Sequence, residues 1–260
     1  MTGHDGASVT LVPGVLSPLP RPAGADPRFA WLAITRHGPD LGAAPPESAA
    51  HTALAARLAR AAGLADAAWA VQVHGGEALA VARPGLAGAA DALATDVPGL
   101  ALLGRSADCP LVLVGGPAAR GRSGLAWGMA HASWRSSVAG IVDRLLELLV
   151  ARYELDPGRA AALVAPSAGP CCYAVGEEVR AAARRALGPA ADRFFADRDG
   201  RLFWDLWATA ADRLAAAGLS PARISVNGWC TICRSDLFHS HRAASGRAGR
   251  GGALVGAIRR

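Results

Sequence analysis

The chain has 260 residues, a formal net charge of +6 and a hydrophobic fraction of 52%, which is enough for one large domain with a substantial core. It lacks both an apolar run of about 18 residues and a secretory signal pattern, so we expect a cytoplasmic protein with no membrane partner. All 27 basic residues are arginine. They are spread along the chain as a compositional bias would spread them, which argues against nucleic acid as a partner.

Residues 1–28 are rich in glycine and proline and predict an irregular lead-in with a short strand at Val9–Val12. Apolar runs bounded by turn residues predict strands, and 3.6-residue spacing closed by glycine predicts helices. In chain order the predicted elements are a strand at Phe29–Thr35, a helix at Glu47–Ala62, strands at Trp69–Val73, Glu77–Ala82, Leu100–Gly104, Leu111–Val114 and Leu125–Ala130, a helix at Ser136–Arg152, a strand at Ala161–Ala165, helices at Gly176–Leu187 and Asp205–Ala217, and strands at Arg223–Val226 and Ala253–Ile258. With no repeat and no linker, the simplest solution is a single α/β domain over residues 29–260.

Three residues with soft or borderline metal-ligand side chains lie at strand ends or in the adjoining turns: His74, Cys109 and His131. These are the places where α/β folds gather functional side chains. Two imidazoles and one thiolate can hold a zinc ion and leave a fourth position open, which is typical of a catalytic rather than a structural site. If the three converge, the chain is a metal-dependent enzyme. Taken singly, each is more often a core or surface residue.

Several short motifs surround these residues in a fixed order. They are Gln72-Val73-His74-Gly75, Ala90-Asp91-Ala92-Leu93-Ala94-Thr95, Ala107-Asp108-Cys109-Pro110, Ala130-His131-Ala132-Ser133-Trp134-Arg135, Gly169-Pro170-Cys171-Cys172-Tyr173, Cys230-Thr231-Ile232-Cys233 and Phe238-His239-Ser240-His241-Arg242. The series resembles the YfiH-like family, whose members were long called laccase-domain or multicopper polyphenol oxidase proteins. They are now regarded as purine nucleoside phosphorylases with adenosine deaminase activity. The resemblance runs from about Phe29 to the C-terminus.

The resemblance implies a metal centre that is also the catalytic site, formed by His74, Cys109 and His131, with zinc as the metal and copper possible. It implies a single-domain, three-layer α/β/α fold with a mixed sheet, distantly like the cysteine-hydrolase domain of cytotoxic necrotizing factor toxins. The expected partners are a nucleoside and phosphate, and the expected state is a monomer or homodimer. An arginine fork suits phosphate. The candidates for binding substrate or phosphate are Arg36, Gln72, Arg135 and Arg242.

The chain departs from the family pattern beside the second histidine. The usual His-Ala-Gly-Trp-Arg-Gly has serine at Ser133 and Ser136, and the usual Ser-Tyr-Arg-Arg ends here in Ala243. The two serines add side chains where close backbone approach or a positive φ could be needed. We therefore expect the metal ligands to be retained and the shell around the substrate to be altered.

Three other functions stay open at the level of sequence. One is a copper-dependent phenol oxidase, and another is a hydrolase of peptidoglycan precursors with Cys109 as nucleophile and His131 as base. The non-enzymatic alternative is an arginine-rich nucleic-acid binder. The remaining cysteines are predicted to be free thiols. Cys230 and Cys233 are expected to pack or to line the pocket, because the adjacent pair Cys171-Cys172 is poorly spaced for completing a metal site with them.

Overall fold

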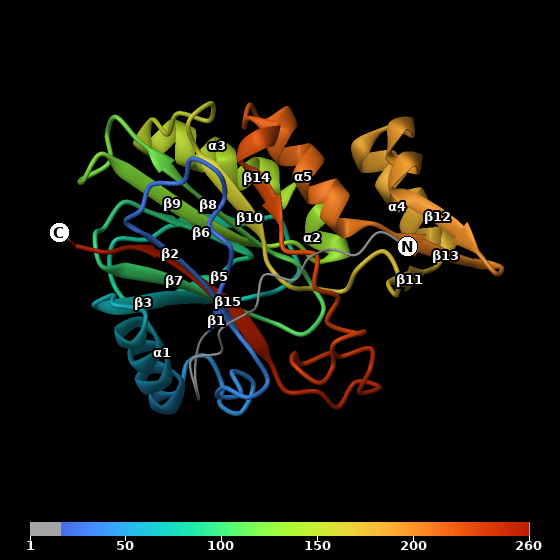
Figure 1. The fold of residues 1–260 in the computed structure, drawn as a ribbon, viewed down its shortest axis with the longest axis horizontal. Coiled ribbons are helices and arrows are strands. Elements are labelled where there is room, and N and C mark those ends of the chain that lie inside the picture. Colours follow the sequence, from blue (N-terminus) through green and yellow to red (C-terminus); the bar gives the residue numbers. More distant parts are fainter. Residues whose placement is uncertain (1–16, 260) are drawn as a thin grey trace.

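Two six-stranded sheets form the centre of the molecule in the computed structural model, which describes residues 17–259 (Figure 1). The predicted strand at Val9–Val12 lies outside these residues. The first sheet has the order β1 (Ser17–Pro18), β2 (Phe29–Ile34), β15 (Gly251–Ala257), β7 (Leu100–Ser106), β3 (Asp66–Val71), β5 (Gly85–Ala89). The second has the order β14 (Ile224–Val226), β10 (Ala161–Val164), β8 (Leu111–Pro117), β9 (Leu125–His131), β6 (Ala92–Thr95), β4 (Ala78–Ala80). Both sheets mix parallel and antiparallel pairs.

Helices cover the outer faces of the two sheets, and a small sheet lies at one end (Figure 1). The α-helices are α1 (Ala49–Ala61), α2 (Trp134–Val138), α3 (Ile141–Tyr153), α4 (Glu177–Leu187) and α5 (Leu206–Ala216), and the 3₁₀ helices are η1 (Pro189–Phe194) and η2 (Pro221–Arg223). The small sheet has the order β11 (Ala174–Val175), β13 (Arg201–Trp204), β12 (Phe195–Arg198). The predicted helix Ser136–Arg152 is divided into α2 and α3, because Gly140 adopts a φ of 76° that no helix continues through.

The core has four apolar clusters, and three of them form layers around the two large sheets. Phe29, Trp31 and Trp127 pack between the two sheets. A second cluster lies between the first sheet and α1, and a third joins the second sheet to α3 and α5. Along β7, Leu102 faces the other sheet and Leu103 faces α1, as the alternation of a strand requires.

The predicted mixed α/β single domain is confirmed, with one difference in its layers. We expected one sheet between two helical layers, whereas the structure places two sheets there. Continuous apolar runs identify strands that are buried on both faces, but they do not tell whether the cover is a helix or another sheet. Among residues 17–259, no helix is both long and apolar enough to cross a membrane.

Candidate functional site

The three predicted metal ligands converge at the strand ends where the two sheets meet. His74 follows β3, Cys109 lies between β7 and β8, and His131 is the last residue of β9. One ligand atom from each of these residues lies within 4.8 Å of the other two. The two imidazole rings have centroids 5.1 Å apart. The first sheet therefore contributes His74, the second contributes His131, and the thiol sits on the connection between the sheets.

The buried carboxylate of Asp91 fixes both histidines. Its oxygens accept hydrogen bonds from the backbone N–H groups of Val73, His74 and Gly75, at 3.1, 3.1 and 2.7 Å. These bonds hold the turn in which His74 has a φ of 60°. Nδ1 of His131 lies 2.8 Å from the same carboxylate. Because an ionised carboxylate only accepts, Nδ1 carries a proton, and Nε2 is the nitrogen that would bind a metal after losing its own proton.

The electrostatics of this cluster favour charged side chains. Burial alone would raise the pKa of Asp91, but its bonds from His131 and from backbone N–H groups lower it. Burial also opposes ionisation of the thiol, yet hydrogen bonds and charge from His131 and His74 lower the pKa of Cys109 to about 7. Burial lowers the basicity of His131, whereas Asp91 and Cys109 together raise its pKa to about 9. A thiolate beside two imidazoles can coordinate a metal or act as a nucleophile.

A cavity of about 850 Å³ opens over the three ligands, and its wall is rich in cationic side chains. The arginines that line it are Arg105, Arg135, Arg242, Arg247 and Arg250. Among residues 17–259, no carboxylate lies within ion-pair distance of any of these five. Burial, followed by the charge of Arg250, lowers the pKa of Arg105. Two partly buried arginines that repel one another favour the binding of an anion between them.

The two acidic residues on the cavity wall are already engaged by the protein. Asp108 has a φ of 96°, and its oxygens accept bonds from the Thr231 hydroxyl at 2.7 Å and from the Arg242 backbone N–H at 2.8 Å. Asp40 accepts bonds from the N–H groups of Gly42 and Arg250, both at 2.7 Å. These carboxylates therefore shape the cavity through bonds to backbone N–H groups and a hydroxyl. The Arg242 side chain donates to the Ala174 carbonyl at 2.8 Å, and the Arg250 side chain donates to the Ala248 and Gly249 carbonyls at 3.0 and 3.2 Å.

Three of the four predicted substrate-binding residues line the cavity, and one does not. Gln72 lines it, but its side chain also bonds both backbone groups of Arg105, at 2.8 and 3.0 Å, and thereby joins β3 to β7. Arg135 lies over the Trp134 ring at 4.4 Å, and Arg242 lies over the Tyr173 ring at 5.0 Å. Arg36 is exposed, donates to the Ser235 carbonyl and is absent from the cavity wall.

Sequence reasoning missed several residues of the site. Asp91 belongs to one of the recognised motifs, and its position just before a short apolar strand was the available signal. Arg105 and Arg250 had no such signal, because they come from distant parts of the chain and meet only through the pairing of β7 with β15. Tyr173 follows the Cys171-Cys172 pair and contributes a buried aromatic wall.

The two serines that depart from the family pattern form a helix cap. Ser133 is the N-cap of α2 with a φ of −58°, so its backbone does not need glycine. Its hydroxyl oxygen accepts the Ser136 N–H at 3.1 Å and lies 2.8 Å from the Ser136 hydroxyl. Both side chains are buried. The replacements thus compensate one another beside the candidate metal ligand His131 and are accommodated without strain.

We expect Ser133→Ala to destabilise the fold by about 1–2 kcal/mol, because it removes the helix cap and leaves the buried Ser136 hydroxyl without its hydrogen-bond partner. Urea unfolding followed by circular dichroism measures this difference. The matched control is Ser220→Ala, since Ser220 is the N-cap of η2 and makes no side-chain capping bond. Equal effects of the two changes would contradict the capping role.

Residues 44–258 match the family described as multi-copper polyphenol oxidoreductase laccase. The chain belongs to this family. The YfiH-like membership predicted from the motifs is thereby confirmed.

Similar proteins of the family carry the name purine nucleoside phosphorylase. The one from Xylella fastidiosa is 38% identical over 182 residues, which cover 67% of this chain and 66% of that protein. YlmD from Geobacillus stearothermophilus is 34% identical over 184 residues, covering 70% of this chain and 64% of that protein. The chain thus spans just under two thirds of the length of these two relatives. The protein from Deinococcus radiodurans is 36% identical over 208 residues, with coverage of 79% and 76%.

Solved structures of the family share the whole fold. The crystal structure of YlmD from Geobacillus stearothermophilus superposes with a TM-score of 0.79 at 26% identity, covering 96% of this chain and 99% of that one. The YfiH protein of Bacillus licheniformis gives a TM-score of 0.78 at 22% identity, covering 98% and 100%. The double-sheet arrangement is therefore the fold of this family.

Proposed function

We propose that the protein is a zinc-dependent purine nucleoside phosphorylase with adenosine deaminase activity. The observation that carries the proposal is the convergence of His74, Cys109 and His131 at the wall of an arginine-lined cavity. The names of its relatives point to the same activity. Residues 29–260 remain our proposed catalytic domain, and a cytoplasmic monomer or homodimer remains our prediction.

The donor set fits a catalytic zinc ion. Two imidazoles and a thiolate leave a fourth position open, and the Asp91–His131 pair is the carboxylate–histidine arrangement that orients a metal ligand. When bound, zinc supplies Lewis-acid chemistry that activates water for attack on C6 of adenine. Copper is the alternative, but the only methionine among residues 17–259, Met129, packs in the core between the sheets. It is therefore poorly placed as the axial ligand that blue-copper sites use.

The cavity suits the two substrates of phosphorolysis. Its volume of about 850 Å³ is in the range of sites that hold a small molecule. Arg105 and Arg250 offer planar forks for the phosphate that attacks the ribose C1′ as the purine leaves. Tyr173 and Trp134 offer aromatic surface for the flat base. These side chains bind and orient the reactants so that phosphate and sugar meet near the metal ligands.

The direct test is incubation of the purified protein with inosine, with and without inorganic phosphate. We expect hypoxanthine and ribose 1-phosphate only when phosphate is present, and inosine from adenosine in a separate, phosphate-independent reaction. Chromatography of the products and metal analysis of the same sample provide the measurements. Fully metal-loaded protein that converts neither nucleoside would overturn the proposal.

Replacing Arg250 by glutamine is expected to raise the KM for phosphate by about 10–100-fold, because one charge-assisted interaction contributes about 1.5–3 kcal/mol. The effect on the KM for inosine should be smaller. Steady-state kinetics at varied phosphate measures the difference. Arg36→Gln is the matched control, since Arg36 is exposed and absent from the cavity wall. A larger effect from Arg36 than from Arg250 would reverse our assignment.

A second function has one specific observation in its favour. Cys109, His131 and Asp91 form a nucleophile, a base and an orienting carboxylate in hydrogen-bonded sequence, which is the arrangement of a cysteine hydrolase. Such an enzyme would act on a peptide-like substrate, such as a peptidoglycan precursor, without any metal. Removal of metal with a chelator separates the two functions. It would abolish a zinc-dependent activity, whereas the activity of a metal-free cysteine hydrolase would be retained.

A further inference from the structure

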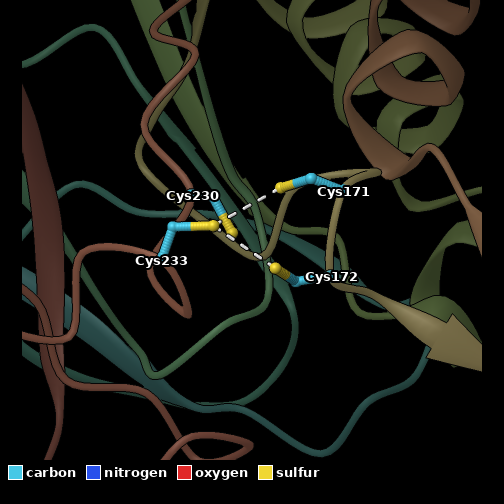
Figure 2. A group of neighbouring side chains, drawn as sticks. All are labelled: Cys171, Cys172, Cys230 and Cys233. Atoms are coloured by element: carbon cyan, nitrogen blue, oxygen red, sulfur yellow. Dashed lines mark hydrogen bonds between the residues drawn. The ribbon is translucent and has the colours of Figure 1, made fainter.

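Four cysteines outside the arginine-lined cavity meet at one point on the surface. Cys171 and Cys172 come from the turn before β11, and Cys230 and Cys233 come from the turn after β14 (Figure 2). All four Sγ atoms lie within 4.8 Å of one another. None of them lines the cavity over the three catalytic ligands. We expected Cys230 and Cys233 to pack or to line that pocket; Cys230 is packed and buried, Cys233 is exposed, and neither lines the pocket, because the fold brings the other cysteine pair to them.

From this cluster we propose a second metal site, a tetrathiolate site that binds zinc in a structural role. Four thiolates with no open position are the donor set of structural zinc. A zinc–sulfur bond of about 2.3 Å in a tetrahedron places the sulfurs about 3.8 Å apart. Sγ of Cys233 lies 3.7 Å from that of Cys171 and 3.3 Å from that of Cys172, as the dashed lines in Figure 2 mark. A disulfide would need about 2.0 Å.

The backbone holds the two cysteine turns against each other without help from a metal. The N–H of Thr231 donates to the Ser167 carbonyl at 3.0 Å, and Ser167 forms a β-bridge with Cys230. A Cβ added to Gly169 would lie 2.7 Å from the Trp207 ring and 3.2 Å from Cβ of Cys230. The close approach of the segments is therefore built into the chain, and the four sulfurs are brought together by the fold rather than by flexible side chains.

The surroundings of the sulfurs also resemble a thiolate site. Gly169 donates its N–H to Sγ of the buried Cys230 at 3.3 Å, and such bonds stabilise sulfur that carries negative charge. Cys230 and Cys233 have the two-residue spacing that is common in zinc knuckles. Cys171 and Cys233 are exposed, so the ion has an entry path from solvent. Adjacent cysteines are unusual as a ligand pair, but here the turn aims both sulfurs inward (Figure 2).

The position of the cluster gives the metal a structural task. Tyr173, which lines the catalytic cavity, directly follows Cys172. Thr231, which directly follows Cys230, donates its hydroxyl to Asp108 at 2.7 Å, and Asp108 precedes Cys109. An ion held by the four thiolates would therefore tie together two loops that both support the cavity wall. This proposal does not depend on which reaction the cavity performs.

Metal content separates the two sites. Protein purified under reducing conditions is expected to contain about two zinc ions per chain, and about one in Cys171→Ser/Cys233→Ser and in His74→Ala alike. Both replaced cysteines are exposed, so the double variant should fold. Wild-type zinc near one per chain, lost in His74→Ala and retained in the double variant, would overturn the proposal. So would mass-spectrometric detection of a disulfide within the cluster as the predominant form of that protein.

A second measurement adds Cys109→Ser, a variant in which all four cysteines of the cluster remain. Cobalt replaces zinc in such sites, and thiolate-to-cobalt charge-transfer absorption grows with the number of sulfur ligands. Cobalt-loaded Cys109→Ser should keep strong charge-transfer absorption, because the tetrathiolate site remains, and Cys171→Ser/Cys233→Ser should lose most of it. The reverse pattern would show that Cys109 is the sole thiolate ligand and would refute the second site.

Discussion

His74→Ala is expected to remove metal from the catalytic site and to lower kcat/KM for inosine and adenosine by about 10³-fold or more. His74 is one of the three proposed ligands, and its side chain is exposed, so its loss leaves the core intact. Loss of Lewis-acid stabilisation worth several kcal/mol reduces the rate tenfold for each 1.36 kcal/mol. Steady-state kinetics and metal analysis of the same preparation measure both effects.

Two further variants make this result interpretable. His74 has a φ of 60°, so His74→Asn keeps a residue that tolerates the left-handed region and separates lost ligation from backbone strain. His37→Ala removes an exposed histidine that does not line the cavity, and it should retain metal and activity. Full activity in metal-depleted His74→Ala would refute metal dependence and favour the cysteine hydrolase.

Asp91→Asn should weaken metal binding by about 10–100-fold and destabilise the fold by about 3–5 kcal/mol. The carboxylate accepts three backbone N–H groups as well as Nδ1 of His131. An asparagine would turn an NH₂ group toward some of these donors, and the imidazole of His131 would no longer be held in one orientation. Titration with a metal-competing dye and urea unfolding measure the two losses.

The loss of stability should depend on pH in a defined direction. The pKa of Asp91 is lower in the folded protein than its ordinary value, so its stabilising contribution is present above the unfolded pKa of about 4 and fades as the pH falls below it. Wild type and Asp91→Asn should therefore converge in acid. The matched control is Asp156→Asn, because Asp156 is an exposed carboxylate that accepts one N–H, from Gly158. A gap between wild type and Asp91→Asn that widens in acid would contradict this role.

The convergence of the three proposed ligands could be predicted because each is marked by local sequence. His74, Cys109 and His131 follow apolar runs that end in turns, and strand ends collect at the edges of sheets. The same logic predicted most strands and every α-helix region, with one helix divided at Gly140. Among the strands that it missed are β12 and β13, which have four residues each and carry three charged residues among the eight. Their Asp199-Gly200 turn, with both φ values positive, was a readable hairpin signal.

The remainder of the site depends on contacts between distant segments. Arg105 and Arg250 become neighbours only when β7 and β15 pair. By sequence spacing alone, the adjacent Cys171-Cys172 pair is a poor chelating motif. In the structure, Cys233 lies beside both sulfurs, although it is 62 and 61 positions away along the chain. Periodicity reports how a segment is buried and says nothing about which segment covers it. For that reason the second sheet, the cationic wall and the cysteine cluster emerged only from the structure.

The three proposed ligands are divided between two sheets, so their relative positions depend on how the sheets pack. His74 belongs to one sheet and His131 to the other, and the aromatic layer of Phe29, Trp31 and Trp127 sets the spacing between them. A substitution in that layer can slide one ligand relative to the other without touching the cavity. The geometry at the cavity therefore depends on the packing of residues far from the proposed ligands.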